Sequence, residues 1–308
     1  MTVVLATPVA GLYRPVPLHG LAGGEPADFA LYLRTADDVW VLYRGVGEAL
    51  DEDHLGRLAA EGIGQLFVRS EDAPRYFARI ETSIEELLRH RHTPLPGRAA
   101  ILHGVATHVA EQLMAGVPDP AMLQRANRVM LSTCGLLQRE SGALAALRRS
   151  LARDRRLAAH SLTVAMVSMG LARYAISADA TVMVEAGLAG LLHDVGRIGY
   201  TDLDHDPEHP ERGADLLAKL QMPTSVVDAA RWHHERWDGS GYPHGLRGGR
   251  IPEMARVVGL VNTFHKVYEA QAGKAGVYDA LRIVAQAYRG CFEERLAVAL
   301  VQTFQAGK

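Results

Sequence analysis

The segment Arg231–Gly245, with the sequence RWHHERWDGSGYPHG, combines two adjacent histidines, acidic residues, two tryptophans and a glycine-rich turn. Adjacent residues on a helix point about 100° apart, so His233 and His234 reach one cation only where the helix ends and the chain folds back. The sequence Asp-Gly-Ser-Gly that starts at Asp238 supplies such an ending. Taken alone, the segment is equally consistent with a surface loop that carries two solvated histidines.

Upstream segments add further residues of the metal-ligand type. His193 and Asp194 close an apolar helix, with Gly196 just beyond it, and a buried carboxylate without a partner is costly. His160 lies on the apolar face of its predicted helix, and His209 lies at the start of another. Each histidine alone is more often a core or loop residue. Four segments that place His or Asp at helix ends or on core faces together favour a metal site.

Composition excludes several classes of protein. The chain has 308 residues, 48% of them hydrophobic, which is enough to form the cores of two domains. Its net charge of −2 gives no sign of a basic surface that would bind DNA. The longest apolar run, 157–176, is interrupted by polar and charged residues, so we expect no membrane span. Residues 1–10 lack the basic start of a signal peptide and are interpreted as an opening strand. Cys134 and Cys291 stand alone in predicted helices, which is typical of buried thiols in a cytoplasmic protein.

Residues 1–95 are predicted to form a small α/β domain. Short segments rich in valine, leucine and aromatic residues predict strands, and two segments with apolar residues at helical spacing predict helices. The predicted strands are 30–34, 39–43 and 65–69, and the predicted helices are 51–60 and 73–91. A sensory or docking role is the default for such a domain, and a purely structural role is the alternative. The proline-rich stretch 93–97 marks its end.

Residues 98–308 are predicted to form an α-helical bundle, which makes the chain mainly α. Apolar residues recur at three- and four-residue spacing almost throughout, and proline or glycine separates most of the segments. The predicted helices are 98–115, 121–140, 144–174, 178–193, 213–220, 225–234, 251–271, 278–289 and 293–304.

The ordered motifs of this region resemble those of the HD-GYP family, a branch of the HD-domain metallohydrolases. The motifs are His160-Ser, Leu192-His-Asp-Val-Gly196, His209-Pro-Glu-Arg-Gly213 and the segment His233–Pro243. The resemblance implies a helical domain that holds two or three iron, manganese or similar divalent ions. It also implies hydrolysis of cyclic di-GMP to linear pGpG or GMP, with the Gly-Tyr-Pro loop contacting substrate or partner proteins. The N-terminal domain resembles the α/β module that often precedes HD-GYP domains.

The resemblance implies a ligand set for each of two metals. Asp194 would bridge them, and the second metal would take three histidines: His209, His233 and His234. The first metal would take His160, His193, Asp194 and an aspartate from an Asp-x-x-Asp-Ala-Leu-like pattern, where this chain has Asn262 and His265. Hard divalent ions bind charged oxygens better than amide oxygens, so we expect the first site to be weaker. Arg156 replaces the glutamate that serves a third metal in some members, which favours two metals.

The resemblance also implies which residues act on a phosphodiester. Asp194 would hold the two cations, which activate water and neutralise phosphate oxygens. Arg197 stands where the family has lysine and, with Arg256, would take phosphate charge, while Tyr242 would contact the nucleotide. Glu235 is expected to fix a histidine tautomer or to be solvated. The segment 199–209 is shorter than in the family and carries aspartates at 202, 204 and 206.

Two functions remain open from the sequence. The retained His and Asp ligands favour catalysis on cyclic di-GMP or a related cyclic dinucleotide. The replacements at Asn262 and His265 favour a degenerate domain that binds cyclic di-GMP or docks a regulator, such as a GGDEF diguanylate cyclase. The oligomeric state is open between a monomer and a homodimer.

Overall fold

The computed structural model describes residues 12–21, 26–35, 37, 39–89, 93–148, 157–200, 206–271 and 276–305. The chain divides into two compact units, Met1–Val105 and Ala106–Lys308. This division falls within helix α3 (Leu95–Met114), about ten residues beyond the expected boundary, and the assignment of domains stays a prediction. The expected opening strand at residues 1–10 lies outside the described residues.

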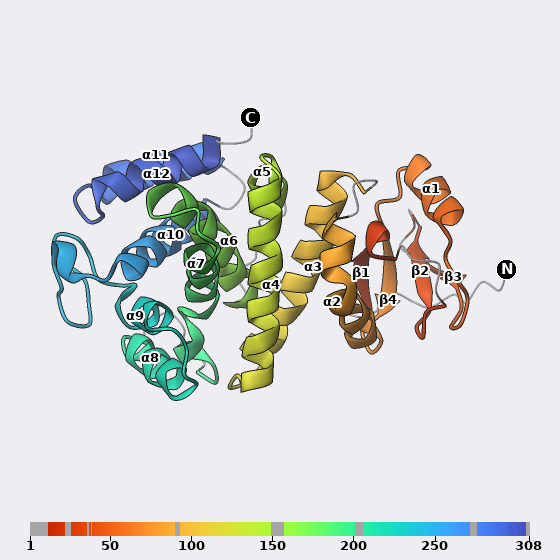
Figure 1. The fold of residues 1–308 in the computed structure, drawn as a ribbon, viewed down its shortest axis with the longest axis horizontal. Coiled ribbons are helices and arrows are strands. Elements are labelled where there is room, and N and C mark those ends of the chain that lie inside the picture. Colours follow the sequence, from red (N-terminus) through yellow and green to blue (C-terminus); the bar gives the residue numbers. More distant parts are fainter. Residues whose placement is uncertain are drawn as a thin grey trace. The chain divides into compact units, whose positions relative to one another are not determined.

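The first unit is built on a four-stranded antiparallel sheet in the order β1-β4-β2-β3 (Figure 1). Its elements are β1 (Tyr13–Pro17), η1 (Leu18–Leu21), β2 (Leu31–Arg34), β3 (Trp40–Arg44), α1 (Glu52–Ala60), β4 (Gln65–Arg69) and α2 (Ala73–Arg89). Leu66 and Val68 are fully buried on β4, which contacts α2. Phe67 points to the opposite face and meets Trp40 edge-on, at 4.7 Å between ring centroids. Alternation along β4 thus gives the sheet two apolar faces.

Strand β1 was not among the predicted strands. Pro15 and Pro17 lie within it and lower its strand propensity, because proline cannot donate a backbone hydrogen bond. The sheet order explains why they are tolerated, since β1 lies at an edge of the four described strands, where it pairs with β4. The three strands that were predicted are confirmed within one residue at either end.

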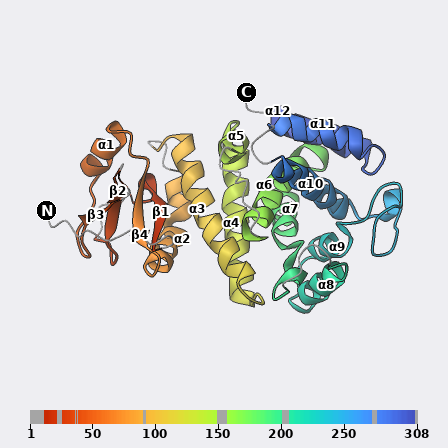
Figure 2. The same ribbon diagram turned by 180° about the vertical axis from the view of Figure 1, so that it is seen from behind.

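The second unit is helical, as the spacing of apolar residues predicts (Figure 2). Its elements after α3 are α4 (Pro120–Arg139), α5 (Ala143–Arg148), α6 (Leu157–Ala175), α7 (Ala180–Leu192), η2 (Val195–Arg197), α8 (His209–Lys219), α9 (Thr224–Trp232), η3 (Gly248–Arg250), α10 (Glu253–Ala270), α11 (Val277–Ala287) and α12 (Glu294–Gln305). The helix expected over 144–174 is represented by α5 and α6, and residues 149–156 between them, Arg156 included, lie outside the described part.

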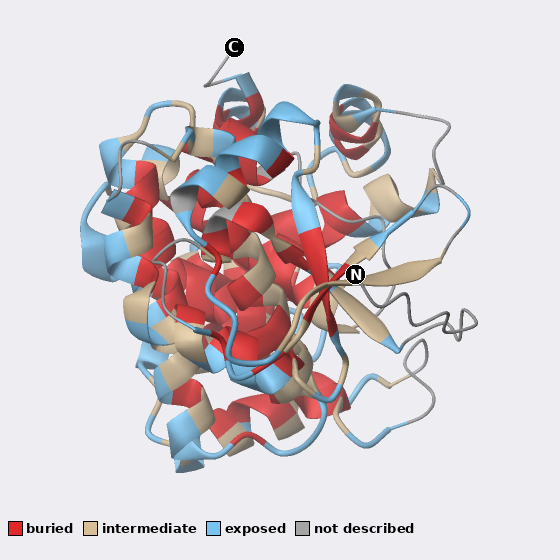
Figure 3. Cartoon of the chain, turned by 90° about the vertical axis from the view of Figure 1, so that its right-hand side faces the viewer, coloured by how far each residue is buried: buried red, intermediate tan, exposed pale blue. Residues whose placement is uncertain are grey.

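Helices α6 and α7 form the centre of this unit. They pack against each other more extensively than any other pair of described elements, and α10 contacts both. Residues 160–172 of α6 are all buried, and Figure 3 shows the buried positions gathered inside the bundle. Asp179 starts α7 by accepting a hydrogen bond from the backbone N–H of Thr181 at 2.8 Å. The apolar helix α7 ends at Leu192, and both this residue and the C-cap residue His193 are fully buried.

Two smaller expectations were tested here. Cys134 is buried in α4 as expected, but Cys291 is half-buried and follows α11 outside any helix, so its placement in a helix was wrong. Both thiols are free. None of the described helices combines the length and the apolar character needed to cross a membrane.

Candidate metal centre

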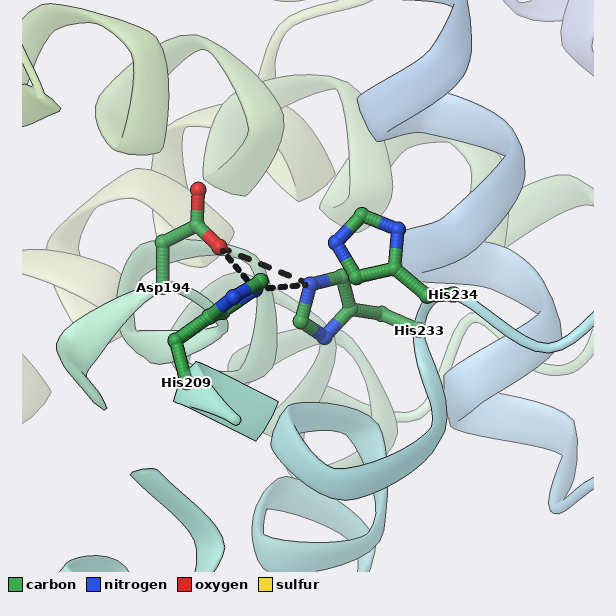
Figure 4. A group of neighbouring side chains, drawn as sticks. All are labelled: Asp194, His209, His233 and His234. Carbon is green, nitrogen blue, oxygen red and sulfur yellow. Dashed lines mark hydrogen bonds and ion pairs between the residues drawn. The ribbon is translucent and has the colours of Figure 1, made fainter. Parts of the chain in front are cut away.

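The ends of three helices bring Asp194, His209, His233 and His234 together (Figure 4). Asp194 follows His193, the C-cap residue of α7, while His209 is the first residue of α8 and His233 directly follows α9. Helix α9 ends at Trp232, two residues before its predicted end at 234, and this lets the chain turn between the two adjacent histidines. Each of the four residues offers one ligand atom, and these atoms lie within 4.8 Å of one another.

Gly196 explains how α8 approaches Asp194 so closely. A Cβ atom at this position would lie 2.1 Å from the carbonyl oxygen of His209 and 2.7 Å from the backbone nitrogen of Gly213. Backbone atoms cannot move aside cheaply, so only glycine allows η2 and α8 to pack at this distance. The glycine two residues after Asp194 is therefore part of what places His209 beside the carboxylate.

The carboxylate of Asp194 is the centre of the cluster. Its Oδ1 atom lies 3.1 Å from Nε2 of His209 and 3.5 Å from Nε2 of His233, and these two nitrogens are 3.4 Å apart. Oδ2 lies 3.5 Å from Nε2 of His193. Asp194 is 3% exposed, and its Oδ1 accepts no hydrogen bond of good geometry despite these neighbours.

Backbone carbonyls fix the orientation of three imidazoles. Nδ1 of His193 donates to the carbonyl of Gly190 at 2.8 Å, and Nδ1 of His233 donates to that of Ala230 at 2.9 Å. Nδ1 of His209 donates to the carbonyl of residue 206. A carbonyl only accepts hydrogen bonds, so each neutral ring presents the lone pair of its Nε2 atom toward Asp194. Several lone pairs facing a carboxylate repel one another unless a cation lies between them.

Burial keeps the imidazoles of His193, His233 and His234 neutral. It lowers the pKa of His233, and it lowers the pKa of His193 and His234 strongly. Burial alone would raise the pKa of Asp194, but the neighbouring histidines, His193 first, outweigh it and hold this pKa well below its usual range. Neutral imidazoles and an ionised carboxylate are the forms that bind transition metals. The cluster is therefore able to bind a metal ion in the forms it holds at neutral pH.

A second group overlaps the first. Ligand atoms of His160, His193 and Asp194 lie within 4.8 Å of one another, which places together the residues expected at the first metal. Nε2 of His160 and Nε2 of His193 are buried without hydrogen-bond partners. Asn262 is 2% exposed, and its Oδ1 is also without a partner. Buried polar atoms left unpaired in this way fit a cation, although the role of each residue as a ligand stays a prediction.

The GYP loop (Asp238–Gly245) folds back over the second histidine. A Cβ on Gly241 would lie 2.4–2.5 Å from backbone atoms of residues 234–236, so this position requires glycine. The ring of Tyr242 stacks on the imidazole of His234 and remains 38% exposed. Glu235 was expected either to fix a histidine tautomer or to be solvated, but it is buried and bonds to backbone groups instead. Its carboxylate accepts hydrogen bonds from the backbone N–H groups of His244, at 2.7 Å, and Leu246, at 2.9 Å, which anchors the loop.

The cationic residues near the cluster differ from those expected. Nε of Arg197 lies 3.0 Å from Oδ1 of Asp194, so this arginine is at the centre as predicted. Arg256 instead forms an ion pair with Glu293 and lies over the ring of Trp237, and its contact with phosphate stays a prediction.

Lys266 and Arg236 were not anticipated. Burial lowers the pKa of both groups, and the charge of Asp194 acts to raise the pKa of Lys266. Lys266 lies on α10, four residues after Asn262, a spacing that puts both on one helix face. That spacing is the signal in the sequence from which Lys266 could have been found.

The site residues therefore come from segments that are far apart in the sequence but meet at the ends of α7, α8 and α9. The model of a protein family described as "HD domain" matches residues 119–290, which is more than half of the chain. The chain belongs to the HD-domain family. This HD domain contains the His193–Asp194 pair at its centre, and HD domains depend on metal ions for their activity.

Relatives and a solved structure agree with this assignment. The chain is 34% identical over 180 residues to cyclic di-GMP phosphodiesterase PA4108 of Pseudomonas aeruginosa, which covers 53% of this chain and 43% of that protein. It is 33% identical over 129 residues to 3'3'-cGAMP-specific phosphodiesterase 2 of Vibrio cholerae, covering 37% and 24%. The match thus spans less than half of each of these relatives.

The fold is also similar to that of Bd1817, an HDG"Y"P protein from Bdellovibrio bacteriovorus. The TM-score is 0.68 at 20% identity, over 95% of this chain and 99% of that one. The mainly α fold and the resemblance to the HD-GYP branch, both predicted from the sequence, are confirmed.

Proposed function

We propose that this HD domain is a metal-dependent phosphodiesterase that hydrolyses a cyclic dinucleotide, with cyclic di-GMP as the first candidate. The observation that carries the proposal is the convergence of Nε2 atoms from His209 and His233 on Oδ1 of Asp194, at 3.1 and 3.5 Å. The relatives named above act on cyclic di-GMP and on 3'3'-cGAMP according to their names, so both dinucleotides are candidates.

Two divalent ions, with iron or manganese as the first candidates, would be held by the two overlapping groups that share Asp194. When bound, such ions activate water for attack on phosphorus and neutralise charge on the phosphate oxygens. His193, His209 and His233 hold the lone pairs of their Nε2 atoms in place through hydrogen bonds to backbone carbonyls. These side chains are therefore already ordered, so they lose little conformational entropy when a cation binds.

The surroundings of the cluster suit an anionic ligand. Arg197 brings positive charge into the cluster, with its Nε atom 3.0 Å from Oδ1 of Asp194. Positive charge at a partly buried site attracts phosphate and favours a phosphodiester. The half-exposed ring of Tyr242, fixed on His234, offers a surface on which a base can stack.

The test is an assay of the full chain with both dinucleotides, in the presence of Mn²⁺ or, without oxygen, Fe²⁺. We expect linear dinucleotide or mononucleotide to form only when metal is present, and Asp194→Asn to remove the activity. Chromatography of the products distinguishes one cleavage from two. Absence of cleavage of both dinucleotides by fully metal-loaded protein would contradict the proposal.

The second candidate is a binding module that retains a metal and binds the dinucleotide but does not hydrolyse it. The observation that favours it is the neutral amide of Asn262 on α10, which weakens the charge available to the first metal. Calorimetry on the same preparation separates the two functions. Tight dinucleotide binding without product formation supports the module, whereas binding followed by cleavage supports the enzyme.

A further inference from the structure

We propose that a cavity between α11 and α12 binds a small amphiphilic molecule with an aliphatic chain and a carboxylate head group. The cavity has a volume of about 570 Å³ and is also lined by α10 and by Trp237, the residue before the GYP loop (Figure 1). Sites for small molecules usually have volumes of about 300–1,000 Å³ and mostly apolar walls. The described residues that line it include none of the candidate metal ligands, and the proposal does not depend on the chain being a phosphodiesterase.

The cavity arises because α11 and α12 both pack on α10 rather than closely on each other. Each of these two helices contacts α10 more than it contacts the other. Buried aliphatic side chains line the deep part of the gap, and these are Leu260 from α10, Leu281 and Val284 from α11 and Leu300 from α12. Val298 on α12 lines the same cavity but is 52% exposed, so it lies at the opening. The walls therefore present aliphatic surface from the opening inward.

The depth of the lining favours a narrow chain over the surface of a partner protein. The four buried aliphatic residues are each at most 7% exposed, so only a ligand that enters between the two helices can contact them. A partner protein would reach the opening around Val298 and leave the deep part unfilled. An aliphatic chain that enters removes both its own apolar surface and that of the walls from water, which is the main favourable contribution to binding.

The charges at the aromatic end of the cavity favour a carboxylate head group. Tyr288 and Phe292 line this end, and the guanidinium of Arg236 lies 4.7 Å from the ring centroid of Phe292. Arg289 is an exposed residue of the lining, and neither arginine forms an ion pair with a described residue. Glu294 is the acidic residue of the lining, so two positive charges stand against one negative charge. A guanidinium binds a carboxylate through two parallel hydrogen bonds, which makes Arg289 the expected contact for the head group.

Trp237 connects the cavity to the GYP loop. It lies three residues after the candidate metal ligand His234 and is part of the cavity lining. Its backbone N–H donates to the carbonyl of Cys291 at 2.8 Å, and its carbonyl accepts a hydrogen bond from the N–H of Gly248 at 3.0 Å. Trp237 is therefore bonded both to the segment between α11 and α12 and to the chain that follows the loop. A ligand that contacts its indole should reduce the mobility of the loop.

Titration of the full chain with octanoate and decanoate tests the proposal, with calorimetry and tryptophan fluorescence as readouts. We expect one saturable site per chain, and binding that becomes about 4-fold tighter with each added CH₂ group. Decanoate should bind more tightly than decanol or decyltrimethylammonium, and it should slow cleavage by trypsin after Arg247. Absence of saturable decanoate binding would overturn the proposal. Equal affinities for the three head groups would overturn the assignment of a carboxylate, and an unchanged cleavage rate would overturn the link to the loop.

Two exposed valines provide a matched pair of variants. Val298→Glu places a carboxylate at the opening of the cavity, so we expect decanoate binding to weaken by about 10-fold or more. Val117 is 73% exposed and is not part of the cavity lining, so Val117→Glu should bind decanoate as the wild type does. Arg289→Gln should reduce the preference for decanoate over decanol. Equal decanoate affinity in Val298→Glu and the wild type would show that the chain binds elsewhere, which would overturn the proposal.

Discussion

The ring of Tyr242 lies nearly parallel to the imidazole of His234, with ring centroids 4.5 Å apart and an angle of 13° between the planes. One face of the tyrosine is thus used to support a candidate metal ligand, and the residue is still 38% exposed. A ring held at this position can stack a base beside the cation cluster.

Tyr242→Ala should therefore weaken binding of a cyclic dinucleotide and leave the metal content unchanged. Stacking on an aromatic side chain contributes about 1–3 kcal/mol per base, so we expect the dissociation constant to rise by roughly 5- to 150-fold. Tyr242→Phe is the control, because it keeps the ring and removes only the hydroxyl. If calorimetry gives equal affinities for Tyr242→Ala and the wild type, the tyrosine only packs the loop.

Glu235 anchors the GYP loop through two backbone N–H groups, those of His244 and Leu246. Glu235→Ala leaves both donors without an acceptor, which should lower the free energy of unfolding by about 2 kcal/mol. It should also loosen the loop, so that trypsin cleaves faster after the exposed Arg247. Glu235→Gln keeps one acceptor oxygen, so its stability and its cleavage rate should lie between those of the wild type and Glu235→Ala. Equal cleavage rates and equal stability in all three proteins would show that the loop is held by other contacts.

The stability of the metal-free protein should fall as the pH falls below about 6.5. Burial lowers the pKa of His193, His233 and His234 in the folded state, whereas the unfolded chain takes up protons near pH 6.5. The unfolded state therefore binds more protons below that pH, and stability is lost there but fully present above it. Urea unfolding with a chelator from pH 8 to pH 5 measures this loss. Stability that is constant or rises on acidification would contradict the assignment of neutral, buried imidazoles.

Asn262→Asp tests whether one neutral amide limits the reaction. The carboxylate adds a charged oxygen on α10 with almost no change in volume, so it should tighten a cation held with His160, His193 and Asp194. We expect the rate of dinucleotide hydrolysis to rise by about 10–100-fold, the range typical of one metal-site group. An unchanged rate with unchanged metal binding would mean that position 262 does not contact the ions.

The parts of the fold that depend on local pattern were predictable. Apolar spacing predicts nearly all the described helices, and the break after Trp232 follows from the Gly-rich turn that starts at Asp238. Strand β1 was missed because Pro15 and Pro17 argue against a strand, and only the sheet order shows that it lies at an edge. Local propensity contains no information on which strand will be at the edge.

Only those residues of the candidate site that lie within sequence motifs were predictable. His193, Asp194, His209, His233 and His234 lie in recognisable segments, and the structure brings them together. The resemblance placed His160 and the segment Asn262–His265 at the same metal, but it did not predict that the imidazoles of His160 and His265, 105 positions apart, contact each other directly. The role of Glu235 was also misjudged. Its position next to two histidines suggested either a partner ring or exposure to solvent, but the loop returns to place backbone N–H groups against it.

The measurement that tests the central claim most directly is the metal content of the purified full chain and of the variant with both His233→Ala and His234→Ala. The account predicts that the variant loses one equivalent of transition metal per chain, and that its melting temperature falls because Asp194 is left buried without a cation. Elemental analysis and thermal unfolding of the two proteins, prepared side by side, give both values. Full metal content and an unchanged melting temperature in the double variant would contradict the assignment of the Asp194 cluster as a metal site.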